Sequence, residues 1–277
     1  MTLPVPESYD WCRRVARHRA RNFYYSFLLL APEQRDALCA VYAFMRECDD
    51  LSDEPGAQRA ALDQWRAELH GALDGRFGQH PCWPALHDAV SRYRIPPNYL
   101  DETIDGVSSD LEPRRIQTFD ELYRYCYLVA SVVGLTIIHI LGFESPEALP
   151  LAEKCGVAFQ LTNILRDVRE DRARDRVYLP RQDLERFGVD PERLVRDSAF
   201  LRLMRFEADR ASRYYGEAMP LLDLVHRRSR PALWALIETY RRLLERIQES
   251  DFDVLDRRIS LSVLQKTGIL ARAFVGR

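Results

Sequence analysis

The segment that most constrains this chain is 160–171, which reads QLTNILRDVRED. Its apolar residues recur at helical spacing, which predicts a helix with one buried face. Asp167 and Asp171 are four residues apart and Asn163 lies four residues earlier, so the three side chains project from one side of that helix. Oxygen ligands in such a row suit Mg²⁺, which binds one or two carboxylates together with water and substrate phosphates. The alternative is a solvated face on which neighbouring arginines pair with the acids.

A second segment, 42–54, repeats this arrangement at the end of an apolar helix that we expect over 32–53. Asp49 and Asp53 are again four residues apart, and Arg46 lies about one turn earlier. Two acidic helix ends that face each other would border a cavity and hold a diphosphate through bridging metal ions. The presence of both segments favours a metal–diphosphate site over two unrelated solvated faces.

Composition and patterning predict a single all-α domain over 1–277. No segment alternates convincingly with period two, the 12 glycines are scattered, and 47% of the residues are hydrophobic. The net charge of −2 gives no bulk attraction for nucleic acid, so we expect no nucleic-acid partner. No glycine-rich nucleotide fingerprint opens a strand–helix unit, and the six histidines lack zinc-ligand spacing.

Cysteine usage and the apolar segments indicate a cytoplasmic protein. The six cysteines show no C-x-x-C spacing, which is typical of reduced core residues. Residues 1–11 lack the basic start and apolar core of a signal peptide. The most apolar run, 128–143, is interrupted by His139 and is shorter than the roughly 20 residues that a membrane span needs. We therefore expect a buried helix there, and contact with the inner membrane only at its periphery.

A long helix is expected over 118–141, because Thr118 and Glu121 have the spacing of a capping box. Ala130, Ser131 and Gly134 leave space along one side of this helix. Such small residues either form a slot for a long hydrocarbon or let two helices pack closely, and the sequence does not decide between these interpretations.

Two further charge clusters are better explained as solvated faces. One is the basic stretch 13–21, which could otherwise meet a diphosphate. The other is the acidic row Asp101, Asp105 and Asp110, which could otherwise join a metal site.

Three motifs together resemble the squalene/phytoene synthase family: 42–54, 160–171, and the sequence Arg-Val-Tyr-Leu-Pro at 176–180. The resemblance extends over about 22–266. It implies an all-α, single-domain helical bundle of the class I isoprenoid (terpenoid) synthase fold with a central apolar cavity. It also implies a Mg²⁺-dependent prenyltransferase that joins two prenyl diphosphates head to head.

The resemblance assigns roles to particular residues. It implies that the metal-binding carboxylates are Asp49, Asp53, Asp167 and Asp171, with Asn163 near a metal or phosphate, and that Tyr127 lies near the reacting carbons. The diphosphate contacts that it implies are Tyr42, Arg46, Gln160, Asn163, Arg166, Tyr240, Arg257 and Arg258. Asn22 stands where many members have serine, and its amide can also hydrogen-bond phosphate.

Residues 22–28 most resemble the bacterial presqualene diphosphate synthases of hopanoid synthesis. This implies condensation of two farnesyl diphosphates to presqualene diphosphate, with NADPH as a cofactor only if the reaction proceeds to squalene. The alternative is a phytoene synthase that joins two geranylgeranyl diphosphates. A single-substrate terpene cyclase and a non-catalytic helical protein are the remaining hypotheses. The expected partners are the prenyl diphosphates, the membrane surface and downstream enzymes of the isoprenoid pathway.

Overall fold

The computed structural model describes residues 3–19, 23–53, 59–112 and 114–275. Within these ranges the chain is helical, and its only extended pairings are two isolated β-bridges. The elements, in chain order, are α1 (Val5–Arg19), α2 (Phe23–Phe27), α3 (Pro32–Asp53), α4 (Arg59–Leu73), α5 (Trp83–Tyr93), α6 (Pro97–Ser108), α7 (Phe119–Cys126), the π-helical turn η1 (Tyr127–Ser131), α8 (Val132–Leu141), α9 (Ala148–Arg166), α10 (Val168–Ala173), α11 (Arg181–Phe187), the short 3₁₀ turn η2 (Pro191–Arg193), α12 (Ser198–Ala218), α13 (Leu221–Leu224), α14 (Arg230–Glu249) and α15 (Val263–Val275).

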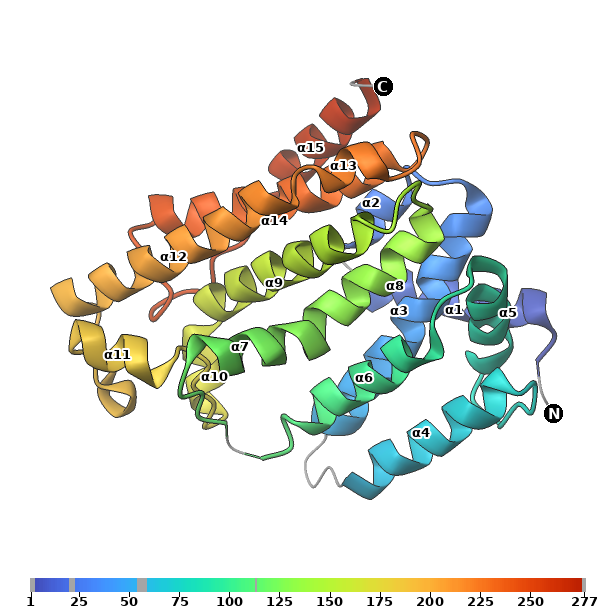
Figure 1. The fold of residues 1–277 in the computed structure, drawn as a ribbon, viewed down its shortest axis with the longest axis horizontal. Coiled ribbons are helices and arrows are strands. Elements are labelled where there is room, and N and C mark those ends of the chain that lie inside the picture. The colour runs from blue at the N-terminus through green and yellow to red at the C-terminus, as the bar shows by residue number, and fades with distance from the viewer. Residues whose placement is uncertain (1–2, 20–22, 54–58, 113, 276–277) are drawn as a thin grey trace.

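Helix α9 occupies the centre of the bundle. It packs against α12 on one side and against α8 and η1 on the other, as Figure 1 shows, and it also contacts α14. Small side chains, among them Ala152, Gly156 and Ala158, are buried along α9 and allow this close packing. The polar C-terminal end of α9 is therefore fixed in position by the helices that pack around it.

Helix α3 begins at Pro32 and ends at Asp53, as the sequence predicts. Leu38, Val41 and Phe44 are almost completely buried on its inner face. Burial of each such side chain contributes roughly 1.5–3 kcal/mol to folding. This apolar stretch anchors the acidic end of the helix against the rest of the bundle.

The segment Phe119–Leu141 is long and apolar enough to cross a membrane, judged by length and composition alone. More than half of its most apolar window, 56%, is buried inside the protein. A central core helix has the same composition, which agrees with the buried helix predicted over 128–143.

The helix predicted over 118–141 begins as expected but is not uninterrupted. Glu121 N donates to the Thr118 hydroxyl at 3.2 Å, which confirms the cap. The π-helical turn η1 then separates α7 from α8. Gly106 and Gly156 both pack against the backbone of this turn, and a Cβ added at Gly156 would lie 2.4 Å from Ser131 Cα.

The helix predicted over 160–171 also contains a break. Asp167, with φ −103° and ψ 16°, ends α9, and α10 begins at the next residue. Asp171 N still donates to Asp167 O at 2.9 Å, so the two acids remain one turn apart.

Replacing Gly156 by alanine should destabilise the protein, because the added methyl group would displace the η1 backbone rather than a flexible side chain. We expect the free energy of unfolding, measured by chemical denaturation, to fall by about 1–3 kcal/mol. Gly216→Ala in α12 is the matched control, since an added Cβ there meets no atom within 4 Å. The control should be neutral or stabilise by up to about 1 kcal/mol. Equal effects of the two substitutions would contradict the close approach.

Candidate active site

Two adjoining cavities lie where α3 meets α9. The first, of about 410 Å³, is lined mainly by polar side chains, including Asp49, Asp167 and Asp171. The second, of about 270 Å³, is lined mainly by apolar side chains from η1, α8, α9 and α14. Asp49, Gln160 and Asn163 border both cavities. A polar chamber therefore adjoins an apolar one across a shared wall of three oxygen-bearing side chains.

The α3 side of the polar cavity is formed by Arg46, Asp49 and Ser52. Arg46 forms an ion pair with Asp50 one turn later, and its NH1 lies 3.8 Å from an Asp49 oxygen. Arg46 Nε is buried and has no hydrogen-bond partner among the described residues. The guanidinium is thus held beside the cavity by acids while part of its donor capacity remains unused.

Asp167 and its basic neighbours form the opposite wall. The carboxylate is only 18% exposed, and it accepts a two-pronged pair of hydrogen bonds from Arg166, with Arg166 Nε at 2.7 Å. Arg258 Nε lies 3.1 Å from the same carboxylate, although Arg258 is exposed and does not itself line either cavity. Bidentate guanidinium pairs fix a carboxylate in orientation, so the Asp167 carboxylate is held in one position at the cavity wall.

The carboxyl group of Asp171 is less closely paired with arginines than that of Asp167. Burial, and after it the charge of the neighbouring Asp167 carboxylate, raise the pKa of this carboxyl group to about 7, while Arg176 opposes the shift. Burial and a nearby like charge both disfavour the ionised form. The surroundings of Asp171 therefore disfavour its ionised form.

The wall shared by the two cavities carries an unused acceptor. Asn163 Nδ2 donates to Gln160 Oε1 at 3.3 Å, whereas Asn163 Oδ1 is buried without a hydrogen-bond partner among the described residues. On the apolar side, Tyr240 stacks on Phe159 with ring centroids 4.3 Å apart. Leaving a buried oxygen unpaired costs about 1–3 kcal/mol, which a ligand bound here would offset.

The small residues of the central helix serve both purposes that the sequence left open. Ala130 and Gly134 line the apolar cavity. Ser131 is instead fully buried, and its hydroxyl donates to Glu153 O at 2.7 Å while its backbone meets Gly156. The slot and the close packing therefore coexist on neighbouring residues.

Asp110 belongs to the site, although the sequence favoured a surface position for its acidic row. It lines the polar cavity and accepts hydrogen bonds from Tyr125 at 2.9 Å and Tyr178 at 3.0 Å. The two tyrosine rings stack with centroids 4.7 Å apart. The rest of the row is on the surface as expected, since Asp101 and Asp105 both pair with Arg66 outside the cavity.

Several residues implied by the resemblance lie elsewhere. The Tyr127 hydroxyl donates to Glu102 at 3.0 Å, and Tyr127 lines neither cavity, so its expected position beside the reacting carbons is not supported. Arg257 is exposed and pairs with Asp253 at 2.7 Å. Tyr42 is within electrostatic reach of Arg46 but lines neither cavity.

Two implied residues are not placed. Asn22 lies outside the described residues. Asp53 ends α3, but its side chain lies outside the described part of the structure.

The donors around the polar cavity are carboxylate and amide oxygens, the ligands that Mg²⁺ prefers. No group of three or more Asp, Glu, His or Cys side chains in the described part of the chain is arranged to hold a metal by itself. Mg²⁺ does not require such a cage, because it retains waters and is commonly shared with substrate phosphates. The unpaired Asn163 oxygen and the crowded Asp171 fit a cation bound together with a diphosphate.

Comparisons with known proteins agree with this geometry. The profile of the squalene/phytoene synthase family matches residues 16–265. A phytoene synthase from Mycobacterium tuberculosis is 38% identical over 283 residues, which cover 97% of this chain and 91% of the relative. The crystal structure of a dehydrosqualene synthase superposes with a TM-score of 0.91 at 28% identity, covering 98% of this chain and 97% of the other. Squalene synthase HpnC from Alicyclobacillus acidocaldarius superposes with a TM-score of 0.84 at 29% identity, covering 90% and 97%.

The fold and the matches define an enzyme of the all-α isoprenoid synthase class, a prenyltransferase, which confirms the predicted fold class. The chain belongs to the squalene/phytoene synthase family, which joins prenyl diphosphates head to head. The family resemblance predicted from the three motifs is therefore confirmed.

Two tyrosine-to-phenylalanine substitutions test which tyrosine contributes to the site. Tyr178→Phe removes a hydroxyl that donates to Asp110 in the polar cavity, whereas Tyr127→Phe removes one that donates to Glu102 outside it. We expect Tyr178→Phe to lower kcat/KM for prenyl diphosphate about 10-fold, since a hydrogen bond to a charged group is worth about 1.5 kcal/mol or more. Tyr127→Phe should leave kcat/KM unchanged. Steady-state kinetics check both, and the opposite ranking would restore Tyr127 to the reacting centre.

Proposed function

We propose that this protein is a Mg²⁺-dependent phytoene synthase that joins two geranylgeranyl diphosphates head to head. The observation that carries the proposal is the pair of adjoining cavities, one lined by acids and arginines and one by apolar side chains. A prenyl diphosphate has the same division into a charged head and an apolar tail. Asp49, Gln160 and Asn163 lie at the boundary, where the bond between head and tail would be broken.

The choice of the twenty-carbon substrate is supported by the relatives. The M. tuberculosis relative named phytoene synthase is 38% identical, whereas squalene synthase HpnC is 29% identical. The closer resemblance to presqualene diphosphate synthases, predicted from 22–28, is not confirmed. Formation of presqualene diphosphate from two farnesyl diphosphates remains the second candidate, favoured by the likeness to HpnC, and NADPH would be needed only if that reaction continued to squalene.

The side chains of the polar cavity would bind and activate the diphosphate. Arg46, Arg166, Arg174 and Arg176 line this cavity, and guanidinium groups suit phosphate oxygens. Bound Mg²⁺, held by Asp49, Asp167, Asp171 and the Asn163 oxygen, would neutralise charge that develops on the leaving diphosphate. Arginines fixed in place stabilise that charge without reorganising during the reaction.

The apolar cavity would orient the hydrocarbon chain and exclude water from the allylic cation. Phe159 and Tyr240 contribute aromatic rings to its wall, next to the shared boundary residues Gln160 and Asn163. The faces of aromatic rings attract cations. This wall can therefore stabilise positive charge on carbon without offering a nucleophile.

Product analysis tests the substrate. The purified protein with Mg²⁺ should convert geranylgeranyl diphosphate to a forty-carbon product, with kcat/KM at least about 10-fold above that for farnesyl diphosphate. Chelation should abolish turnover, and NADPH should not change the product. Preference for farnesyl diphosphate would favour the second candidate. A cyclised product from one substrate molecule would indicate a terpene cyclase, and no metal-dependent diphosphate release would indicate a non-catalytic protein.

Neutralising the acids tests the metal-binding roles. Asp49→Asn and Asp167→Asn should each lower kcat by about 100-fold or more, because each removes a charged ligand that acts on the developing negative charge. Asp105→Asn is the matched control, since Asp105 is an exposed acid that pairs with Arg66 outside both cavities. Activity and the Mg²⁺ concentration for half-maximal rate should be measured together. Full activity of Asp49→Asn would contradict the assignment.

A further inference from the structure

A large groove lies apart from the two cavities of the active site. Its volume is about 970 Å³, and none of its lining residues borders the polar or the apolar cavity. It is formed by the connection between α2 and α3, by α13, by the start of α14 and by the end of α15. Figure 1 shows α2, α13 and the end of α15 towards the upper right, with α10 at the lower left.

The groove is lined by apolar residues and by arginines. Its apolar lining residues are leucine, alanine, proline or tryptophan: Leu28, Leu29, Leu30, Ala31, Leu222, Pro231, Trp234 and Ala273. Its basic lining residues, called here the rim arginines, are Arg227, Arg228, Arg230 and Arg272, and none of the described residues that line it is acidic. Leu28 is 47% exposed, and Phe274, next to Ala273, is 62% exposed. An exposed apolar surface of this kind marks an interaction site.

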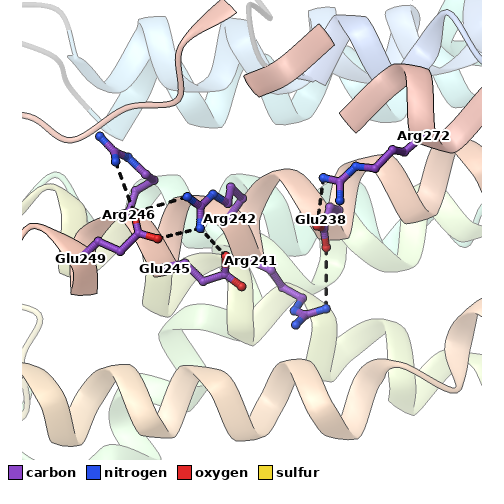
Figure 2. Close-up of polar contacts among 7 residues, drawn as sticks. All are labelled: Glu238, Arg241, Arg242, Glu245, Arg246, Glu249 and Arg272. Carbon is purple, nitrogen blue, oxygen red and sulfur yellow. Dashed lines mark hydrogen bonds and ion pairs between the residues drawn. The ribbon is translucent and has the colours of Figure 1, made fainter. Parts of the chain in front are cut away.

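Three of the four rim arginines differ from the arginines on the neighbouring face of α14, whereas the fourth, Arg272, pairs with Glu238. Figure 2 shows that the arginines of α14 pair with acids of the same helix, and that Glu238 also pairs with Arg272 of α15; the α14 residues in this network are Glu238, Arg241, Arg242, Glu245, Arg246 and Glu249. Arg227 and Arg228 are exposed and form no ion pair among the described residues. Among the described residues, Arg230 donates to the carbonyl oxygens of Asp223 and Val225 and forms no ion pair. Arg227, Arg228 and Arg230 therefore give the groove positive charge that no acid in the described part of the chain neutralises.

We propose that this groove is a docking surface for a phospholipid bilayer with anionic headgroups. Basic side chains next to a membrane attract anionic lipids, and tryptophan and leucine favour the interface between headgroups and acyl chains. A second copy of this chain is a poor occupant, because pairing of two identical grooves would bring their arginines together. The inference does not depend on which prenyl diphosphate the enzyme uses.

The docking surface would place the apolar cavity next to the bilayer. Alternate residues of α13 and α14 face the two spaces: Leu221, Leu233 and Leu236 line the apolar cavity, whereas Leu222, Pro231 and Trp234 line the groove. One layer of helix therefore separates the groove from the cavity. A hydrocarbon product released on this side would have a short path to a medium in which it dissolves.

Vesicle flotation with the purified full chain tests the proposal. The probes are vesicles of phosphatidylcholine alone and of phosphatidylcholine mixed with phosphatidylglycerol. We expect binding to the anionic vesicles, weakening as salt is raised, and much less binding to the neutral ones. The double variant Arg227→Glu with Arg228→Glu should lower the partition coefficient by roughly 30-fold or more, since each basic residue near an anionic surface contributes about a 5-fold effect.

The matched control is Arg202→Glu with Arg213→Glu, which makes the same charge change at exposed arginines of α12 that line no cavity and form no ion pair in the described part of the chain. The control should bind vesicles nearly as well as the unaltered protein. Leu28→Ser should weaken binding while leaving its salt dependence in place. Thermal unfolding and turnover in solution should be unchanged in the groove variants, which separates lost docking from lost folding.

Three results would overturn the proposal: no binding of the unaltered protein to anionic vesicles, equal binding to neutral vesicles, or equal losses in the two arginine double variants. Binding that depends on the groove but is displaced by soluble geranylgeranyl diphosphate would also overturn it, because the groove would then be a second ligand pocket rather than a membrane surface.

Discussion

The burial of several carboxylates around one cavity, together with their mutual repulsion, is the constraint on which the active end of this bundle depends. Asp49, Asp110 and the pair Asp167 and Asp171 come from three separate parts of the chain and line the same space. Arginines and tyrosines neutralise or hydrogen-bond some of these groups, yet the pKa of Asp171 is still raised to about 7 by burial and by Asp167. Holding such groups together costs stability. A bound cation and diphosphate would offset this cost, so ligand affinity and the cost of gathering these acids are linked.

The packing of the surrounding helices holds these carboxylates in fixed positions. Helix α3 brings Asp49 to the cavity because its preceding turns are buried in the core. Helix α9 carries Asn163 and ends at the α9–α10 break. Both lie at the cavity because Gly156 lets α9 lie directly against the η1 backbone. A side chain at this position would push α9 away from the η1 backbone. The glycine therefore acts on the site from a distance, through the spacing of two helices.

Local pattern was enough to predict much of this. The apolar spacing of 32–53 predicts α3, and the capping box at Thr118 predicts the start of α7. The paired acids identify Asp49, Asp167 and Asp171 as residues of one site, and all three line the polar cavity. Asp110 was missed because its environment is made by Tyr125 and Tyr178, which are 15 and 68 residues away. The position of Tyr127 beside the reacting carbons was implied by the family resemblance alone; the residue lies in a π-helical turn and lines neither cavity. The break at Asp167 has no counterpart in the apolar spacing of 160–171, which predicts one helix.

The central claim is that acids from α3 and from the α9–α10 break hold one cation–diphosphate group between them. A crystal structure with Mn²⁺ and a non-hydrolysable thio-diphosphate analogue of geranylgeranyl diphosphate tests this most directly, because the anomalous signal of manganese locates each metal. We expect metal bound by the diphosphate together with Asp49 on one side and with Asp167, Asp171 or Asn163 on the other, and the prenyl chain in the apolar cavity. Metal bound outside the polar cavity, or a diphosphate bound with no metal at these acids, would contradict the account.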